Sequence, residues 1–351
     1  MSDTISEARR QIEICNACRY CEGFCSVFPA MTRNKAFLDG DLTHLANLCH
    51  NCRGCYHACQ YTAPHEFALN IPAVLAEVRT DSWERLARPQ GIARLFQRHG
   101  VAMAGLLVVA LALFFWLLAA FRPAEGAGFY AYMAHNLMIA LFIPAFLGPL
   151  ALIFLALRDY WRETGGGRIR LADIARAGDM AARMKNLKGG GDGCNFEDGD
   201  RFSHKRRVFH QLMMWGFLAC FAATSAGTVM HYILGWPAPY PIWSLPKLLG
   251  IPGGIAMVAG AAGLASLKLR AERALGDARV WGGEMAFILL LGAVALTGLM
   301  LYAATGTTAV GPLLAVHLAT VMTLFLLMPF SKMVHGFFRF TALIAEAGKS
   351  R

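Results

Sequence analysis

Two cysteine runs, CNACRYCEGFC at residues 15–25 and CHNCRGCYHAC at residues 49–59, decide the fold of the first hundred residues. Each run has the spacing C-x2-C-x2-C-x3-C, and together they hold eight of the ten cysteines. This spacing is typical of ligands that close around cubane iron–sulfur clusters, and it is not that of a disulfide framework. The sequence therefore predicts two [4Fe–4S] clusters and, with them, one-electron chemistry.

Zinc is the alternative for these cysteines, because paired CxxC units also form tetrahedral zinc sites. A zinc site needs two CxxC pairs, whereas each run here has three cysteines at CxxC steps and then a fourth cysteine. The pattern fits zinc poorly and favours clusters.

In two-cluster ferredoxins the fourth cysteine of each run ligates the cluster of the other run. Carried over to this sequence, that arrangement gives two groups of ligands. The first cluster set is Cys15, Cys18, Cys21 and Cys59, and the second cluster set is Cys49, Cys52, Cys55 and Cys25. The bacterial pattern has a proline after the fourth cysteine, whereas Ser26 and Gln60 follow here. The cluster type is therefore better supported than the loop geometry.

The remaining sequence is too apolar for a pair of soluble domains, since 56% of all residues are hydrophobic and only 16% are charged. Six apolar stretches are each long enough to cross a bilayer, which takes about 20 residues. They lie at 101–121, 133–157, 208–234, 248–268, 284–304 and 312–338. No nucleic-acid motif accompanies the net charge of +10, so we expect no nucleic-acid partner.

We expect a mainly α protein, in which a helical ferredoxin-like head with two [4Fe–4S] clusters precedes a six-helix transmembrane bundle. The predicted parts are the cytoplasmic head (1–98), spans one and two (99–157), a basic glycine-rich cytoplasmic loop (158–207), spans three to six with haem b (208–338) and a cytoplasmic tail (339–351).

Lysine and arginine are dense in the 158–207 loop and recur between Lys268 and Arg279, whereas the opposite loops carry only Arg122 and Lys247. By the positive-inside rule the head and both termini are cytoplasmic. The polar first twelve residues have no apolar core of a signal peptide, which agrees with this orientation. The sequence predicts a multi-pass protein of the bacterial inner (cytoplasmic) membrane.

The 158–207 loop contains GGGDGCNFEDGD at residues 189–200. Neither G-x-G-x-x-G after a strand nor a Walker motif is present, so we interpret the glycines as a flexible loop. Two four-cysteine clusters use the eight cysteines of the two runs, so Cys194 remains as a spare thiol.

Four histidines in the predicted spans are candidate haem ligands, because ionisable residues in a membrane are costly and usually functional. They are His210 and His231 in span three, and His317 and His335 in span six. At 100° per residue each span shows its two histidines on one face. Antiparallel helices bring His210 level with His335, and His231 level with His317.

This is the arrangement of one or two bis-histidine b-type haems in a helical bundle. Two alternatives stay open. Histidines at membrane interfaces are common without any ligand role, and His135 at the start of span two competes with His231 as an outer ligand.

The two-run cysteine head, the six-span tail, GGGDGC at 189–194 and RRVFH at 206–210 together resemble the tricarballylate-utilisation protein B family, also called TcuB or CitB, over essentially the whole chain. The resemblance implies a protein that reoxidises a partner FAD-dependent dehydrogenase, the tricarballylate dehydrogenase TcuA. Electrons would then pass through the clusters and haem b to membrane quinone. No dinucleotide fingerprint occurs in this chain, which agrees with a separate flavoprotein.

The leading hypothesis is an electron-transfer subunit of the flavoprotein:quinone oxidoreductase type. One alternative is a membrane anchor or redox-sensing subunit without quinone reductase activity, and another is reverse electron delivery from quinol to a cytoplasmic reductase. Trp161 with the cytoplasmic histidines marks one candidate quinone region, and His135, Tyr232 and Trp236 mark one on the outer side.

Overall fold

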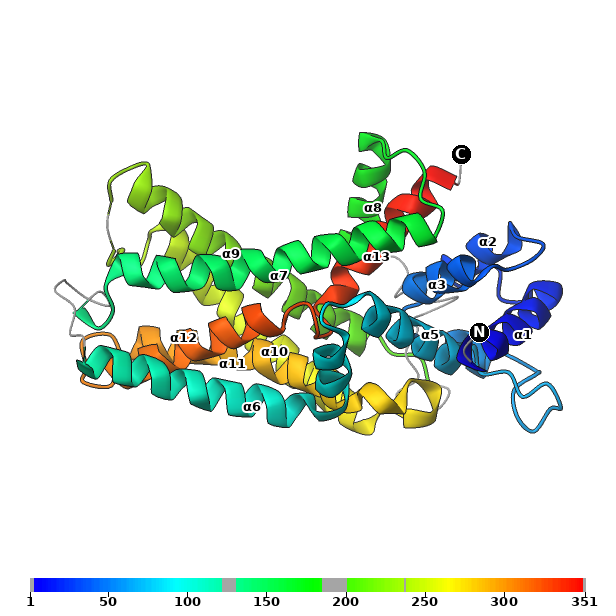
Figure 1. Cartoon of the computed structure of the whole chain (residues 1–351), viewed down its shortest axis with the longest axis horizontal. Helices are drawn as coiled ribbons and strands as arrows, with labels where there is room; N and C mark the ends of the chain where they lie inside the picture. Colours follow the sequence, from blue (N-terminus) through cyan, green and yellow to red (C-terminus); the bar gives the residue numbers. More distant parts are fainter. Residues whose placement is uncertain (1–2, 122–130, 185–200, 237, 350–351) are drawn as a thin grey trace.

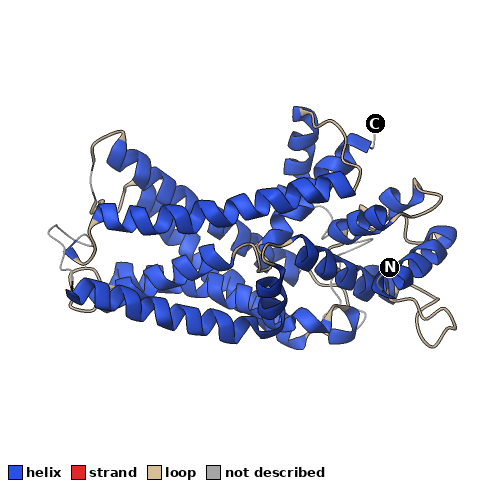
Figure 2. Cartoon of the chain, in the orientation of Figure 1, coloured by secondary structure: helices blue, strands red, loops and turns tan. Residues whose placement is uncertain are grey.

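The structure is a computed structural model that describes residues 3–121, 131–184, 201–236 and 238–349. Throughout these residues the regular structure is helical and contains no strand (Figure 2). The head and the membrane helices follow one another along the long axis of the molecule (Figure 1). The prediction of a mainly α fold with a helical head and six membrane helices is confirmed.

The head contains five helices that surround the cysteine runs. They are α1 (Asp3–Cys18), α2 (Val27–Thr32), α3 (Asp39–Leu48), α4 (Gly54–His57) and α5 (Ile71–Leu86). Helix α5 packs against α1 and α3, and their apolar faces meet at the fully buried side chains of Ile12, Leu42 and Leu75. At the start of α5, the Asn70 side chain accepts a hydrogen bond from the Ala73 N–H at 3.2 Å, as expected of an N-cap.

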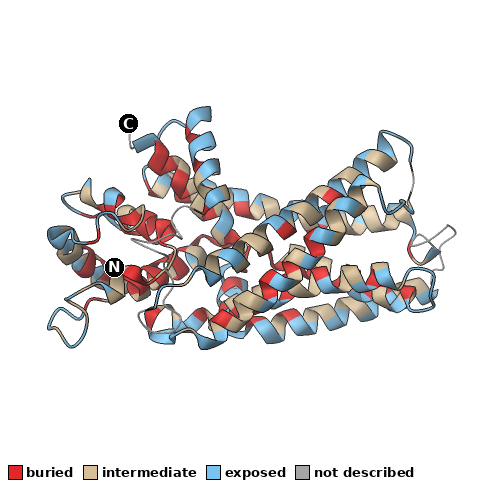
Figure 3. Cartoon of the chain, turned by 180° about the vertical axis from the view of Figure 1, so that it is seen from behind, coloured by how far each residue is buried: buried red, intermediate tan, exposed pale blue. Residues whose placement is uncertain are grey.

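Six helices of the described chain are long and apolar enough to cross a membrane. They are α6 (Gln90–Phe121), α7 (His135–Glu163), α9 (Lys205–Tyr232), α10 (Leu245–Arg270), α11 (Trp281–Ala303) and α12 (Val310–Leu327). Their outer faces are largely exposed, whereas buried residues gather in the head and where the head meets the bundle (Figure 3). The chain is therefore a membrane protein with an N-terminal cysteine domain. A kink at His99 in α6 lies at the predicted domain boundary after residue 98.

Glycines let α9 and α10 approach closely, as the glycine-rich fourth span predicts. A Cβ added to Gly260 on α10 would lie 2.6 Å from the Met213 nitrogen and 2.8 Å from the Phe209 oxygen, both on α9. Gly216 on α9 meets the Gly253 oxygen in the same way, at 2.7 Å. Backbones this close leave no room for a side chain.

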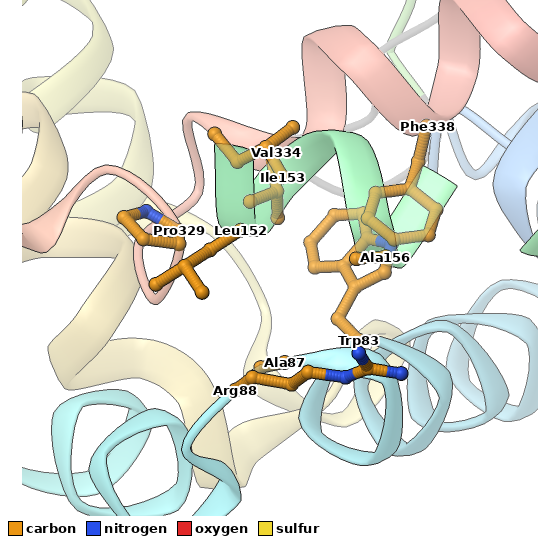
Figure 4. A pocket seen from close by; sticks show the side chains of 9 residues that line it. All are labelled: Trp83, Ala87, Arg88, Leu152, Ile153, Ala156, Pro329, Val334 and Phe338. Atoms are coloured by element: carbon orange, nitrogen blue, oxygen red, sulfur yellow. The ribbon is translucent and has the colours of Figure 1, made fainter. Parts of the chain in front are cut away.

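The predicted span at 312–338 is wrong in its second half. Helix α12 ends at Leu327, and after a turn through Pro329 the chain begins a separate helix, α13 (Val334–Lys349). Proline has no N–H to continue a helix and clashes with the preceding turn. Around this turn Trp83, Ile153 and Phe338 pack together (Figure 4).

The predicted tail at 339–351 is largely helical, because α13 continues to Lys349. Helix α13 diverges from α12 (Figure 1) and packs against α3, α7 and α8 (Leu171–Arg183). One element from the C-terminal end of the chain thus lies between the head and the bundle.

Candidate cofactor site

The thiols of the first cluster set lie near one another in the structure. Burial and, after it, repulsion from the thiols of Cys21, Cys59 and Cys18 raise the pKa of Cys15 to about 12. The pKa of Cys21 rises to about 11 for the same reasons, with Cys59 and Cys18 as its neighbours. The fourth cysteine of the second run therefore lies among the first three cysteines of the first run.

The second cluster set lies together in the complementary way. Burial, followed by repulsion from Cys52 and Cys49, raises the pKa of the Cys25 thiol. The pKa of Cys55 is raised by burial and then by Cys52, Cys49, Cys25 and Cys21. Cys21 belongs to the first cluster set, so the two groups adjoin.

These thiols fit cationic iron, because ligation requires thiolates and a bound metal supplies the positive charge that the crowded thiols lack. Among the described residues no three or more His, Cys, Asp or Glu side chains form a site for a single metal ion. A cubane spreads its cysteines over different iron atoms, so the ligands of a cluster need not converge on one point.

A cavity of about 680 Å³ lies between the cysteine head and the membrane helices. Its walls include residues of the second cysteine run, of α5 and α13, and of the spans α9, α10 and α11. Most of the residues that line it from the spans are apolar, among them Met213, Phe217 and Phe287, and the charged residues Lys268 and Glu284 line it as well. The volume falls within the range of ligand and cofactor sites.

His210 and His335 line this cavity and face each other, with ring centroids 5.8 Å apart and ring planes at 84°. His335 Nδ1 hydrogen-bonds the backbone carbonyl of Lys332, which fixes the ring and leaves Nε2 for a ligand. The Nδ1 atom of His210 is buried without a hydrogen-bond partner among the described residues. An imidazole pair beside an apolar cavity suits haem iron.

The two outer histidines are paired differently from the prediction. His231 contacts His135, the alternative ligand, with ring centroids 4.6 Å apart. His317 instead lies against α11, where its Nδ1 is 3.0 Å from the Thr297 hydroxyl. The reason is packing, since α9 lies along α10 whereas α12 packs against α6, α7 and α11.

The structure also separates the residues of the first candidate quinone region, because Trp161 does not line the cavity that His210 and His335 line. Trp161 packs under Gly166 at the end of α7, away from the cavity lining. Tyr232 hydrogen-bonds His135 at 2.5 Å in the region that is predicted to lie on the outer side, and Trp236 is exposed. Cys194 and the rest of the segment 185–200 lie outside the described residues.

Two groups of charged residues at the cavity were not predicted. Glu284 of α11 pairs with Lys268 of α10 and with Lys332 in the turn before α13. Arg79, Arg206 and Arg339 lie on the head side of the cavity. Glu284, Lys268 and Lys332 fall within predicted apolar spans, and charge in such a position is itself a signal of function. No feature of the sequence singled out the three arginines as functional.

The comparisons with known proteins cover the whole chain. Residues 8–84 match the model of the citrate utilization protein B Fer4-like domain, and residues 92–351 match that of citrate utilization protein B. The chain is 43% identical to citrate utilization protein B of Escherichia coli, over all of this chain and 94% of that protein. No solved structure matches. A Fer4-like head on membrane helices is the organisation described above, and the chain therefore belongs to the citrate utilization protein B family.

Proposed function

We propose that this protein reoxidises the reduced FAD of a partner dehydrogenase, a tricarballylate dehydrogenase by family resemblance, and delivers the electrons to membrane quinone. The family and its Fer4-like domain support electron transfer in a utilization pathway. When bound, two [4Fe–4S] clusters and haem b supply the one-electron steps that a two-electron flavin and a two-electron quinone require between them.

One observation carries the proposal, namely the position of the cavity between the second cysteine run and the histidine pair. His50 and Asn51, which lie between Cys49 and Cys52, line the same cavity as His210 and His335. A single cavity is thus lined both by the loop of the second cysteine run and by the imidazoles of His210 and His335. A redox sensor or simple anchor has no need of this continuity.

The two cluster sets differ in position, with the first at the surface for electron entry and the second beside the cavity for electron exit. Cys18 and Tyr20 of the first run are exposed, so the first cluster set is the side that a soluble flavoprotein reaches. In the second cluster set no cysteine is exposed, and Cys49 precedes the loop that lines the cavity. His210 and His335, which line the same cavity, are the residues that would hold haem iron.

The test uses the purified full-length protein. We expect about eight cluster irons per chain, from two cubanes, and a b-type α-band in the reduced-minus-oxidised spectrum. His210→Ala and His335→Ala should lose this band and the ability to reduce a quinone analogue when the reduced flavoprotein partner supplies electrons. His317→Ala is the matched control in the same membrane part and should keep both.

Cluster iron confirms that each variant has folded its head. The proposal is contradicted if the protein contains its clusters and haem but the partner flavoprotein cannot reduce a quinone through it. Retention of the full haem band in both His210→Ala and His335→Ala would remove this pair as ligands.

A further inference from the structure

Three arginine side chains from distant parts of the chain converge on backbone carbonyls of the second cysteine run. Arg79 of α5 and Arg339 of α13 both donate to the carbonyl of Cys49, at 2.9 and 2.6 Å. Arg206 of α9 donates to the carbonyls of Asn51 and His50, at 2.8 and 3.1 Å. We call Arg79, Arg206 and Arg339 the arginine collar.

Two members of the collar have no anionic side chain to balance them. Among the described residues, no carboxylate lies within 4 Å of the guanidinium group of Arg79 or of Arg339. Arg79 is buried, with 8% of its surface exposed. A buried or half-buried cation without a counter-charge is costly, and the half-buried Arg339 shares the Cys49 carbonyl with the buried Arg79.

The missing negative charge is what a thiolate-ligated cluster at Cys49 provides. Such a cluster is anionic, and reduction adds one more negative charge, so nearby cations stabilise the reduced form more than the oxidised form. Positive charge close to a cluster therefore raises its reduction potential.

Among the described residues, the first cysteine run has no comparable set of arginines from distant parts of the chain. Its own arginine, Arg19, is exposed and donates to the local carbonyl of Asn16 at 3.1 Å. The arginines of α1 are paired with carboxylates, Arg9 with Asp39 and Arg10 with Glu7. These carboxylates largely neutralise the positive charge of Arg9 and Arg10, which therefore has little effect on the first cluster set.

We propose that the arginine collar raises the reduction potential of the cluster held by the second cluster set above that of the first. This inference rests on the proposed function, because it concerns the clusters that function requires. Electrons that enter at the exposed first set then move downhill toward the cavity. Arg206 lies on the membrane helix α9 and Arg339 on α13, which follows the last membrane helix, so the full effect exists only when these helices pack against the head.

The experiment is a redox titration of the full-length protein, followed by electron paramagnetic resonance of the two reduced clusters. Arg339→Gln and Arg79→Gln should each lower the higher of the two midpoint potentials and leave the lower one unchanged. For one unit charge in a partly buried setting we expect about a tenfold change in the reduced-to-oxidised ratio, which equals about 59 mV for a one-electron couple.

Two further variants separate charge from structure. Arg339→Lys keeps the charge but not the fork of donors, and it should retain most of the higher potential. Arg85→Gln is the matched control on α5, because Arg85 pairs with Glu163 and not with the cysteine loop; neither midpoint should move.

The inference is overturned if the lower midpoint moves, if both midpoints move equally, or if neither moves while both clusters are present. If Arg339→Gln fails to assemble its clusters, Arg79→Gln decides by the same criterion. Failure of the proposed function has a different signature, because the wild-type protein would then contain its clusters but pass no electrons from the reduced flavoprotein to a quinone, whatever the two midpoint potentials.

Discussion

At the residue scale, a costly arrangement at the membrane helices is the ion triad of Lys268, Glu284 and Lys332. The side chains are largely buried, with Glu284 19% exposed and Lys268 18% exposed. The carboxylate that the two lysines share offsets the free-energy cost of removing their charges from water. Loss of any one of the three ions therefore leaves the others with less compensation. The triad also joins α10, α11 and the turn before α13, which carries the Lys332 carbonyl that positions His335.

Glu284→Gln should therefore destabilise the protein strongly. The substitution leaves two lysines without a carboxylate, and breaking a buried ion pair costs about 3–5 kcal/mol. Unfolding in mixed micelles measures the loss of free energy. Glu66→Gln, at an exposed site in the head, is the control and should stay within about 0.5 kcal/mol. Equal stability of the two variants would show that the triad contributes nothing.

The sequence was informative at this scale only where function depends on local spacing. The cysteine ligands could be proposed because CxxC steps within one run carry the signal. The arginine collar could not, because Arg339 and the Cys49 carbonyl are 290 residues apart in the chain. Such a contact depends on tertiary packing, which helical periodicity does not predict.

At the element scale, the pairing of α9 with α10 positions His210. Gly260 meets the α9 backbone at Phe209 and Met213, on either side of this histidine. The apolar length of each span was readable from the sequence, and so was the value of small residues in span four. The choice of partner was not. Spans three and six were expected to face each other, whereas α12 packs against α6, α7 and α11, and His210 of α9 meets His335 of α13.

Gly260→Ala should displace α9 from α10, because the new methyl group would lie 2.6 Å from the Met213 nitrogen. Overpacking of this kind costs about 1–3 kcal/mol. We expect lower unfolding stability and, because His210 moves with α9, a smaller haem α-band per protein. Gly105→Ala on α6 is the matched control, since its Cβ would meet nothing within 4 Å. A normal haem band in Gly260→Ala would separate the helix contact from the histidine site.

The broken sixth span illustrates a second limit of sequence patterns. Apolar residues continue across 312–338, and their composition alone predicts one helix. Pro329 ends that helix instead, and α13 turns toward the head, where Arg33 and Glu346 form an ion pair at 2.6 Å. His335 thereby reaches His210 from a different element than the one predicted.

At the scale of the whole molecule, the head is fastened to the membrane part by polar contacts from several directions. Asn51 donates to the Leu275 carbonyl at 3.0 Å, and Arg53 donates to the Glu272 carbonyl at 2.9 Å, both beyond the end of α10. Arg88 pairs with Asp159 of α7. These contacts place the cysteine loops on the same side of the bundle as the ends of α7 and α10.

This arrangement makes the orientation in the membrane testable with reporter fusions. The described ends of the arginine-rich 158–207 segment and the Lys268–Arg279 segment contact the head, and by the positive-inside rule we propose that this side is cytoplasmic. Alkaline phosphatase fused after Thr305, in the turn between α11 and α12, should be active because the enzyme folds only outside the cytoplasm. The same reporter fused after Arg351 should be inactive, and a fluorescent protein there should be bright. The reverse pattern would place the clusters outside, where a cytoplasmic flavoprotein could not reach Cys18.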